Sequence, residues 1–224
     1  MKRSEQTSLL GAFREMESAR RGPKENHLKQ LEFLFDYGSP FSYLASTQMP
    51  GLAARTGATV VYRPILLGAV LKATGNASPM TIPAKGKYMA RELQRTAARL
   101  AAPFKPNPHP FITNTLKLMR GAVAAQKLGT FERWHPAIYR AVWADALDLG
   151  DDAVMMRVLA RAGIRAADLL AAADRPDVKE ELRANTDAAV SRGVFGAPTF
   201  FVAGEMFWGN DRLSWVEEIL GAAE

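Results

Sequence analysis

Residues 29–44 read KQLEFLFDYGSPFSYL and join a strand-like run to the start of a helix. Phe33 and Phe35 stand in a segment whose apolar density is typical of a strand buried on both faces. Gly38 then ends the strand. Pro40 suits the first helical turn, because the N–H that proline lacks would be unpaired there in any case. The segment therefore predicts a buried strand followed directly by a helix.

The next residues extend this beginning into a βαβ unit. The run 41–57, FSYLASTQMPGLAARTG, predicts a helix that Pro50 kinks or breaks and that ends near Gly57. The run 59–65, TVVYRPI, predicts a second strand. Because strand, helix and strand follow one another at this spacing, we expect the two strands to be parallel.

The middle of the chain is helical in composition, and strands return only near the C-terminus. APTFFVAGEMFWG predicts two short strands joined by a tight turn at residues 203–205, and a last helix is expected from Asp211 to about Leu220. Prolines 103, 106, 108 and 110 mark a loop within the helical block. The predicted helices of that block span residues 84–101, 113–129, 131–147, 151–161 and 166–173.

This order of elements, βαβ, a helical block and ββα, predicts an α/β protein with a thioredoxin-like fold and a large all-helical insertion. We assign residues 29–72 and 186–224 to the thioredoxin-like domain and residues 73–185 to the insertion. Residues 1–28 lack the apolar core of a signal peptide, and we expect a mobile or loosely docked extension.

Composition narrows the function further. The 224 residues include no cysteine, so thiolate nucleophiles, disulfides and cysteine metal sites are excluded. His27, His109 and His135 lack the spacing of a metal site. The net charge of +6 is dispersed and accompanies no nucleic-acid-binding motif, and no apolar run is long enough to span a bilayer. We therefore expect a cytoplasmic protein that binds no metal, nucleic acid or membrane.

Ser39-Pro40-Phe41-Ser42 has the spacing of a Cys-x-x-Cys redox motif with hydroxyls in place of both sulfurs. In redox proteins the partial positive charge of a helix N-terminus lowers the pKa of the first cysteine. Ser39 cannot supply a thiolate, but it can donate a hydrogen bond to the thiolate of a ligand. The alternative is a plain helix N-cap, for which serine is a favoured residue.

Five segments in order along the chain carry a family resemblance: FDYGSPFSYLA, RPILLGAVLKATGN, KGKY at 85–88, VFGAPTFFV and MFWGNDRL. Together they resemble the 2-hydroxychromene-2-carboxylate isomerases and, less closely, the kappa-class glutathione transferases. Both belong to the DsbA-like branch of the thioredoxin fold. The resemblance implies a glutathione-dependent cis-trans isomerase in which Ser39 keeps the glutathione sulfur ionised. It also implies that a homodimer is possible.

The resemblance implies further glutathione contacts, including a cis Ala197-Pro198 bond whose alanine backbone clasps the cysteinyl unit. Asp211 and the free N–H groups at the start of the last helix would bind the γ-glutamyl end. Capping of that helix, and an ordinary turn proline before a strand, remain open alternatives. The glutathione-binding residues implied are Ser39, Asn76, Ala197, Pro198, Trp208, Gly209, Asn210 and Asp211.

An aromatic carboxylate substrate is expected between Ser39 and the helical block. Polar contacts are assigned to the loop PFKPNPHPFITN, in which His109 replaces the asparagine expected from the naphthalene-pathway enzymes. Core packing for the aromatic residues and a solvated position for Lys85 remain open. The predicted substrate residues are Tyr37, Phe41, Lys85, Tyr88, Asn107, His109 and Asn114.

The implied reaction interconverts 2-hydroxychromene-2-carboxylate and trans-o-hydroxybenzylidenepyruvate, with the glutathione thiol as a nucleophile that is regenerated. Two alternatives stay open on the sequence alone. A kappa-like transferase or peroxidase would consume glutathione, and a non-catalytic glutathione-binding protein would turn over no substrate.

Overall fold

The computed structural model describes residues 29–109 and 114–221. The predicted N-terminal extension and Pro110 of the proline-rich loop lie outside these residues. A mixed four-stranded sheet has the order β2-β1-β3-β4, in which β1 and β2 are parallel and the pairs β1–β3 and β3–β4 are antiparallel. The strands are β1 (Gln30–Phe35), β2 (Thr59–Pro64), β3 (Thr199–Val202) and β4 (Glu205–Trp208).

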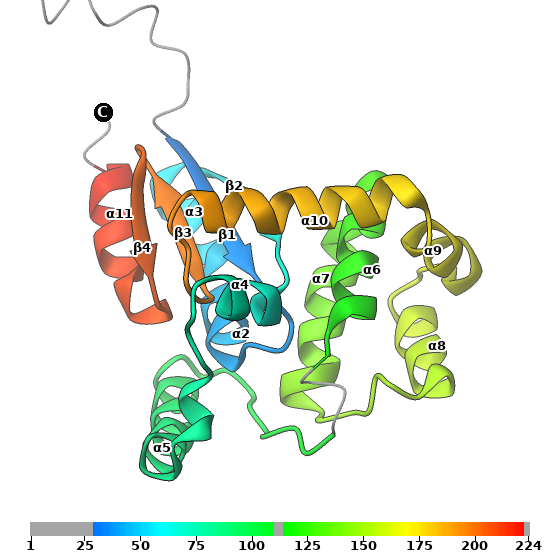
Figure 1. The fold of residues 1–224 in the computed structure, drawn as a ribbon, viewed down its shortest axis with the longest axis horizontal. Helices are drawn as coiled ribbons and strands as arrows, with labels where there is room; N and C mark the ends of the chain where they lie inside the picture. The colour runs from blue at the N-terminus through cyan, green and yellow to red at the C-terminus, as the bar shows by residue number, and fades with distance from the viewer. Residues whose placement is uncertain (1–28, 110–113, 222–224) are drawn as a thin grey trace, which may run out of the picture.

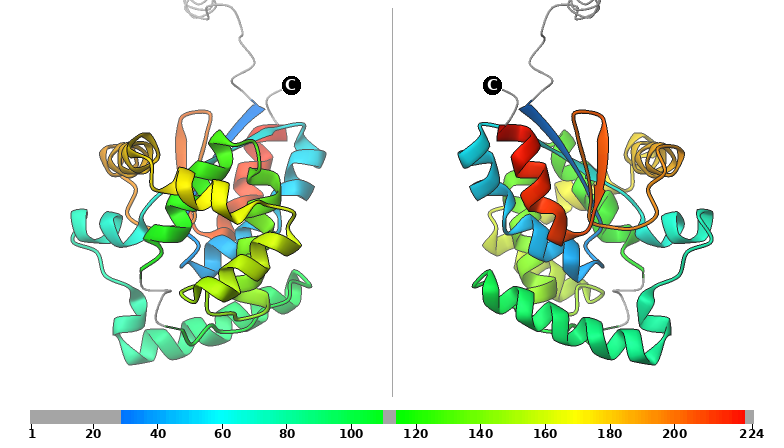
Figure 2. Two further views of the ribbon diagram at one scale, coloured as in Figure 1. Left: turned by 90° about the vertical axis from the view of Figure 1, so that its right-hand side faces the viewer. Right: turned by 90° about the vertical axis from the view of Figure 1, so that its left-hand side faces the viewer.

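Helices cover both faces of this sheet, as Figures 1 and 2 show. The ten α-helices of the described residues are α2 (Pro40–Ser46), α3 (Met49–Thr56), α4 (Leu67–Ala73), α5 (Pro83–Arg99), α6 (Leu116–Lys127), α7 (Phe131–Tyr139), α8 (Asp152–Arg161), α9 (Ala166–Ala173), α10 (Pro176–Ser191) and α11 (Leu213–Gly221). Helices α4 and α10 lie on one face, while α3 and α11 pack together on the other. Helices α5 to α9 all lie between β2 and β3 in the chain.

Successive side chains of β1 point to opposite faces of the sheet. Phe33 and Phe35 belong to the main core, whereas Leu34 points into a smaller cluster with Ile65 and Val70 under α4. Every one of these side chains is at most 2% exposed, so β1 is buried on both faces as its sequence predicts. The predicted thioredoxin-like fold with a helical insertion is confirmed.

Two predicted helices differ in detail from the structure. The run 41–57 forms two helices, and Pro50 lies in the first turn of α3, so the break that proline predicted is present. The predicted helix 131–147 ends in a π-helical turn, η4 (Arg140–Ala144). Asn107 supports this ending, because its side-chain amide donates to the carbonyl oxygens of Val142 (2.9 Å) and Leu147 (3.0 Å).

Helices α4 and α10 were not predicted, although both cover the sheet. The boundary that we assigned at residues 185/186 falls inside α10, which contacts α6 as well as α4 and β2. The division into two domains therefore stays a prediction. The expected turn at 203–205 is a two-residue turn in which Ala203 and Gly204 have φ of 51° and 84°, and Glu205 already belongs to β4.

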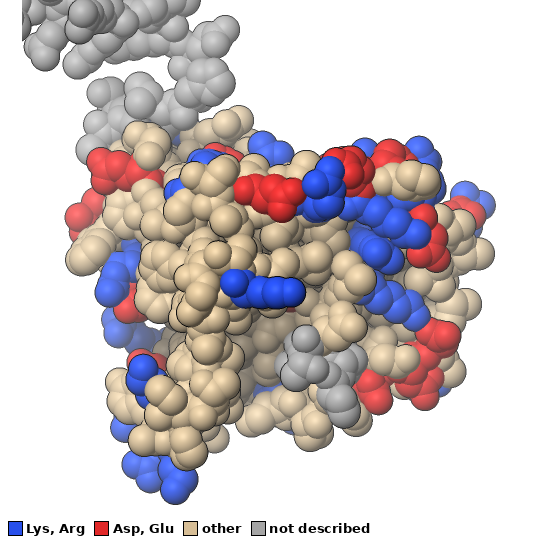
Figure 3. Space-filling model, in the orientation of Figure 1, with Lys and Arg blue, Asp and Glu red and all other residues tan. Residues whose placement is uncertain are grey.

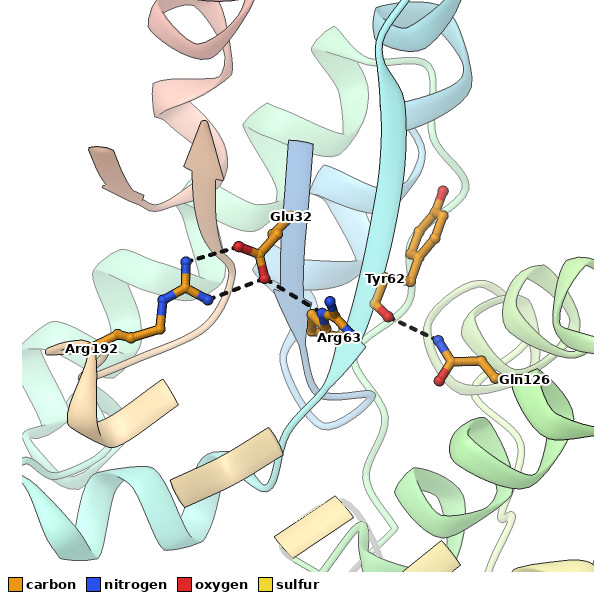
Figure 4. Close-up of polar contacts among 5 residues, drawn as sticks. All are labelled: Glu32, Tyr62, Arg63, Gln126 and Arg192. Atoms are coloured by element: carbon orange, nitrogen blue, oxygen red, sulfur yellow. Dashed lines mark hydrogen bonds and ion pairs between the residues drawn. The ribbon is translucent and has the colours of Figure 1, made fainter. Parts of the chain in front are cut away.

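Polar side chains fasten two helices to the strands. Figure 4 shows Glu32 of β1 accepting two hydrogen bonds from Arg192, at the end of α10, and a longer one from Arg63 of β2. Gln126 of α6 donates to the backbone oxygen of Tyr62 at 2.8 Å. These contacts hold the end of α10 against β1 and hold α6 against β2.

Candidate active site

Ser39 lies at the end of the loop between β1 and α2, where it caps the helix. Its backbone φ and ψ are −93° and 112°, and its Oγ accepts a hydrogen bond from the N–H of Ser42 at 3.1 Å. Its own N–H donates to the Asp36 carbonyl oxygen at 3.0 Å. The side chain is buried, at 4% exposed. The N-cap is therefore real, and it leaves the hydroxyl proton free for another partner.

That partner is the backbone oxygen of Ala197, to which Ser39 Oγ donates at 3.0 Å. The Ala197-Pro198 bond is cis, as predicted. The Ala197 N–H has no hydrogen-bond partner among the described residues, and Ala197 is partly exposed. Residues far apart in sequence thus place a hydroxyl, a carbonyl oxygen and a free N–H side by side.

A second free donor lies in the first turn of α2. The N–H groups of Ser42 and Tyr43 both bond to Ser39, through its Oγ and its carbonyl oxygen. Phe41 is partly buried, and its N–H has no partner among the described residues. The sequence argument assigned Phe41 only as an aromatic wall, so this backbone donor beside Ser39 was missed.

The remaining predicted glutathione residues form one rim around Ala197 and Pro198. Asn76 donates to the carbonyl oxygen of Phe195 at 2.9 Å. The N–H of Gly209 donates to the Pro198 carbonyl oxygen at 3.0 Å. The structure therefore brings both segments to the loop before β3, which contains the cis proline.

Trp208 and Asp211 extend the same rim. The Trp208 indole is 50% exposed, and it packs on the ring of Phe195 with centroids 4.9 Å apart. Asp211 forms an ion pair with its neighbour Arg212 at 2.5 Å, within the 3₁₀ turn η5 (Asn210–Arg212) that precedes α11. Asn210 begins this turn, so the expected last helix starts as a 3₁₀ turn before α11.

Tyr37 does not have the position that we predicted for it. The residue is completely buried, its ring packs on Phe35 and Tyr139, and its hydroxyl lies 3.1 Å from Nδ1 of His135. Burial lowers the pKa of His135 to about 3, so this histidine is neutral near neutral pH. Tyr37 is therefore a core residue, and its assignment as an aromatic wall of the substrate site is corrected.

The other predicted substrate residues are spread over two parts of the molecule. Lys85 and Tyr88 are exposed on α5, which contacts α2. Asn107 uses its amide to hold the backbone after α7, and its Oδ1 accepts from the N–H of His109. His109 lies 3.4 Å from Asp148, and Asn114 accepts from the N–H of Leu116 at the start of α6. Asn107 and Asn114 make no hydrogen bond with Ser39, and Asn107 has a clear structural role.

A buried carboxylate behind the loop was missed by the sequence argument. Asp36 is 2% exposed and accepts hydrogen bonds from the N–H groups of Gly38 and Leu67, both at 2.8 Å, and from the Thr115 hydroxyl at 2.7 Å. Burial raises its pKa, against the lowering effect of these three donors. Asp36 thereby ties the Ser39 loop to α4 and to the beginning of the helical block. An acid directly after the apolar run 33–35 was the available signal.

Two structural features are absent from the described residues. Their helices are too short or too polar to cross a bilayer. Their histidine, aspartate and glutamate side chains form no cluster of three or more that could hold a metal ion.

Comparison with known proteins identifies the class that this fold and site define. Residues 30–221 match the family model of the DSBA-like thioredoxin domain, and the chain belongs to that family. The chain is 35% identical over 194 residues to a 2-hydroxychromene-2-carboxylate isomerase of Sphingobium xenophagum. The matched segment covers 86% of this chain and 98% of the relative.

Two further relatives refine the grouping. A solved 2-hydroxychromene-2-carboxylate isomerase structure superposes with a TM-score of 0.78 at 29% identity, covering 86% of this chain and 95% of that one. Human glutathione S-transferase kappa 1 is 27% identical over 209 residues, which cover 86% of this chain and 91% of the relative. Within its family the chain thus groups with the 2-hydroxychromene-2-carboxylate isomerases and is an isomerase, with kappa-class glutathione transferases as more distant relatives.

Proposed function

We propose that this protein is a glutathione-dependent isomerase that interconverts 2-hydroxychromene-2-carboxylate and trans-o-hydroxybenzylidenepyruvate. One observation carries the proposal: in a chain without cysteine, the Ser39 hydroxyl lies at the start of α2 and contacts the backbone of Ala197, beside the cis proline. This arrangement keeps the geometry of a thiol site and leaves the sulfur to be supplied by a ligand.

The residues present fit a thiol-bearing peptide. The partly exposed Ala197 offers an unpaired N–H and a carbonyl oxygen, which are the two groups that an extended peptide pairs with in an antiparallel arrangement. The unpaired N–H of Phe41 and the hydroxyl of Ser39 are donors on the adjacent helix start. Glutathione, when bound, would supply the thiolate that adds reversibly to the conjugated double bond and so permits its rotation.

Ser39 then has one proton to share between two acceptors. In the structure its hydroxyl donates to the Ala197 oxygen, so it must rotate away from that oxygen before it can donate to a sulfur. The vacated carbonyl oxygen is then open to an amide N–H of the bound peptide. Ser39 and the Phe41 N–H are therefore the groups that stabilise negative charge on the sulfur, and Ala197 orients the peptide.

The test is an absorbance assay of the chromene carboxylate with and without glutathione. Replacing Ser39 with alanine (Ser39→Ala) should lower the glutathione-dependent rate by about a hundredfold, because a positioned donor to a developing charge is lost. Ser42→Ala is the matched control. Its Oγ is buried without a hydrogen-bond partner, and the rate should stay near that of the unmodified protein. An unchanged rate in Ser39→Ala would refute the role of Ser39.

A kappa-like transferase is the second candidate, because that family also matches nearly the whole chain. It would use the same donors but release a conjugate or an oxidised product. The two reactions differ in thiol balance. Free thiol that is fully recovered after many turnovers supports the isomerase. Loss of one thiol for each substrate conjugated, or of two thiols for each peroxide reduced, supports the transferase.

A further inference from the structure

A cavity of about 660 Å³ lies among α6, α8 and α9, away from the site around Ser39. Its described walls include the apolar side chains of Leu116, Met156 and Leu170. They also include Asn114, which the sequence argument assigned to the substrate site, but no residue of α2, β3 or β4. The cavity is open to solvent, since the lining side chains of Asp152 and Asp174 are 81% and 80% exposed, and its volume is within the range of roughly 300–1,000 Å³ that is typical of small-molecule sites. Figure 3 shows charged side chains gathered on this side of the molecule, where Figure 1 places α8 and α9.

Most of the charge that lines the cavity is neutralised within the protein. Lys117 forms an ion pair with Asp152 across the gap between α6 and α8. Asp174, beyond the end of α9, lies 3.6 Å from Lys179. The fourth charged side chain of the described lining is Arg120, which makes no ion pair with any described residue.

Arg120 also has an unsatisfied donor. It lies on α6, one turn after Leu116, and its Nε is buried with no hydrogen-bond partner among the described residues. Buried donors on charged groups are normally paired, because leaving one unpaired loses its hydration without replacement. A guanidinium fits a carboxylate especially well, since its N–H groups form two parallel hydrogen bonds to the two oxygens.

We propose that this cavity binds a small organic anion that has one carboxylate and a compact apolar body. The carboxylate would pair with Arg120, and the apolar body would pack on Leu116, Met156 and Leu170. We infer one negative charge on the ligand because Arg120 is the single cation of the described lining that has no ion-pair partner. We infer an apolar body because the walls formed by Leu116, Met156 and Leu170 are apolar. This inference does not depend on glutathione or on the isomerase reaction.

Calorimetric titration with 1-naphthoate, without glutathione, tests the proposal on the full chain. Arg120→Gln should weaken binding by at least about tenfold, because a charged donor to the carboxylate is lost. Arg99→Gln is the matched control, because it removes one exposed positive charge from α5 and should leave the affinity unchanged. Equal binding by both variants, or no binding of 1-naphthoate by the unmodified protein, would overturn the proposal.

Methyl NMR of the methionine side chains locates the ligand. Met156 lines the cavity, whereas Met206 lies on β4, two residues before Trp208 of the rim around Ala197. The ring current of 1-naphthoate should shift the Met156 methyl signal and leave that of Met206 in place. The reverse pattern would assign the binding to the region of Ser39 and refute the cavity site.

Two further measurements keep the test decisive. If Arg120→Gln fails to fold, Met156→Glu replaces it, because Met156 is 47% exposed and a carboxylate there would provide Arg120 with a partner. This variant should also lose binding by about tenfold or more. Inorganic phosphate and 1-naphthalenemethanol separate charge from shape. Each should bind more weakly than 1-naphthoate, and equal binding of either one would refute the requirement for both features.

Discussion

Two carboxylates, one in β1 and one just after it, lie in opposite environments. Glu32, near the beginning of the strand, is 24% exposed in its side chain and faces the guanidinium groups of Arg63 and Arg192. Asp36, just after the strand, is buried and faces two N–H groups and one hydroxyl, with no cation in contact. Hydrogen bonding to Arg192 lowers the pKa of Glu32, whereas burial raises the pKa of Asp36.

The difference shows that the two carboxylates hold the structure in different ways. Glu32 joins α10 to the sheet through an ion pair that solvent reaches, and such pairs contribute little to stability. Asp36 joins the loop before Ser39 to α4 and Thr115 through hydrogen bonds from which water is excluded. Loss of Asp36 leaves all three donors unpaired, so the Asp36 end of the strand is the more sensitive to change.

The largest expected effect follows from replacing Asp36 with alanine. Asp36→Ala leaves the N–H groups of Gly38 and Leu67 and the Thr115 hydroxyl without their acceptor. Each unsatisfied buried group costs about 1–3 kcal/mol, so the free energy of unfolding should fall by about 3 kcal/mol or more. Urea denaturation followed by circular dichroism measures this change.

Thr115→Val is the matched control for that variant. It removes one donor and leaves Asp36 with its two backbone partners, so the expected loss is about 1 kcal/mol. Equal losses in the two variants would show that Asp36 has no special role in holding the loop.

The pH dependence of stability should have opposite signs at the two ends of β1. Because the folded pKa of Asp36 lies above its ordinary value of 3.8, the folded state retains this proton longer than the unfolded state. Its contribution to stability is therefore greatest at low pH and is lost as pH rises through the folded pKa. Because the pKa of Glu32 lies below 4.5, its contribution is present above that pH and is lost as pH falls through the folded pKa.

Unfolding measurements at about pH 4 and about pH 7 compare the two residues directly. Asp36→Asn should destabilise the protein more at the lower pH, and Glu32→Gln should destabilise it more at the higher pH. If both variants changed stability in the same direction with pH, the contrast between the two carboxylates would be wrong.

Arg192→Gln should have a moderate effect. Arg192 donates to both oxygens of Glu32, at 2.8 and 3.1 Å, and its guanidinium lies 3.5 Å from the centre of the Phe201 ring. An exposed pair and a cation–π contact together suggest a loss of about 1 kcal/mol in the free energy of unfolding. A loss as large as that of Asp36→Ala would contradict the ranking of the two ends.

Arg63→Gln should have the smallest effect of the series. Its Nε is 3.4 Å from Glu32, and its side chain is 49% exposed. The expected loss is a few tenths of a kcal/mol, within the range of exposed pairs. Thermal unfolding at low and high salt checks this, because screening should remove what remains of the effect.

Much of the sheet and of the site rim could be predicted from the sequence. The apolar run of β1, the parallel pairing with β2 and the cis peptide at Pro198 are confirmed, the last of them by resemblance and not by local pattern. Helix α4 was missed because it is short, and α10 because its composition is mixed, so the stability of both comes from covering the sheet. Tyr37 was misplaced because an aromatic residue beside Ser39 fits a core position and a ligand wall equally well.

The sequence by itself determined that the chain has no sulfur nucleophile, that its first elements form a βαβ unit, and that a serine stands where redox relatives need a thiol. Only the tertiary structure decided that the Ser39 hydroxyl donates to Ala197, that Asp36 is buried with three donors, and that Arg120 faces a cavity without a partner. The reason is physical. Composition and periodicity act between neighbours in the chain, whereas each of these contacts joins segments that meet only when the sheet and the helical block pack together.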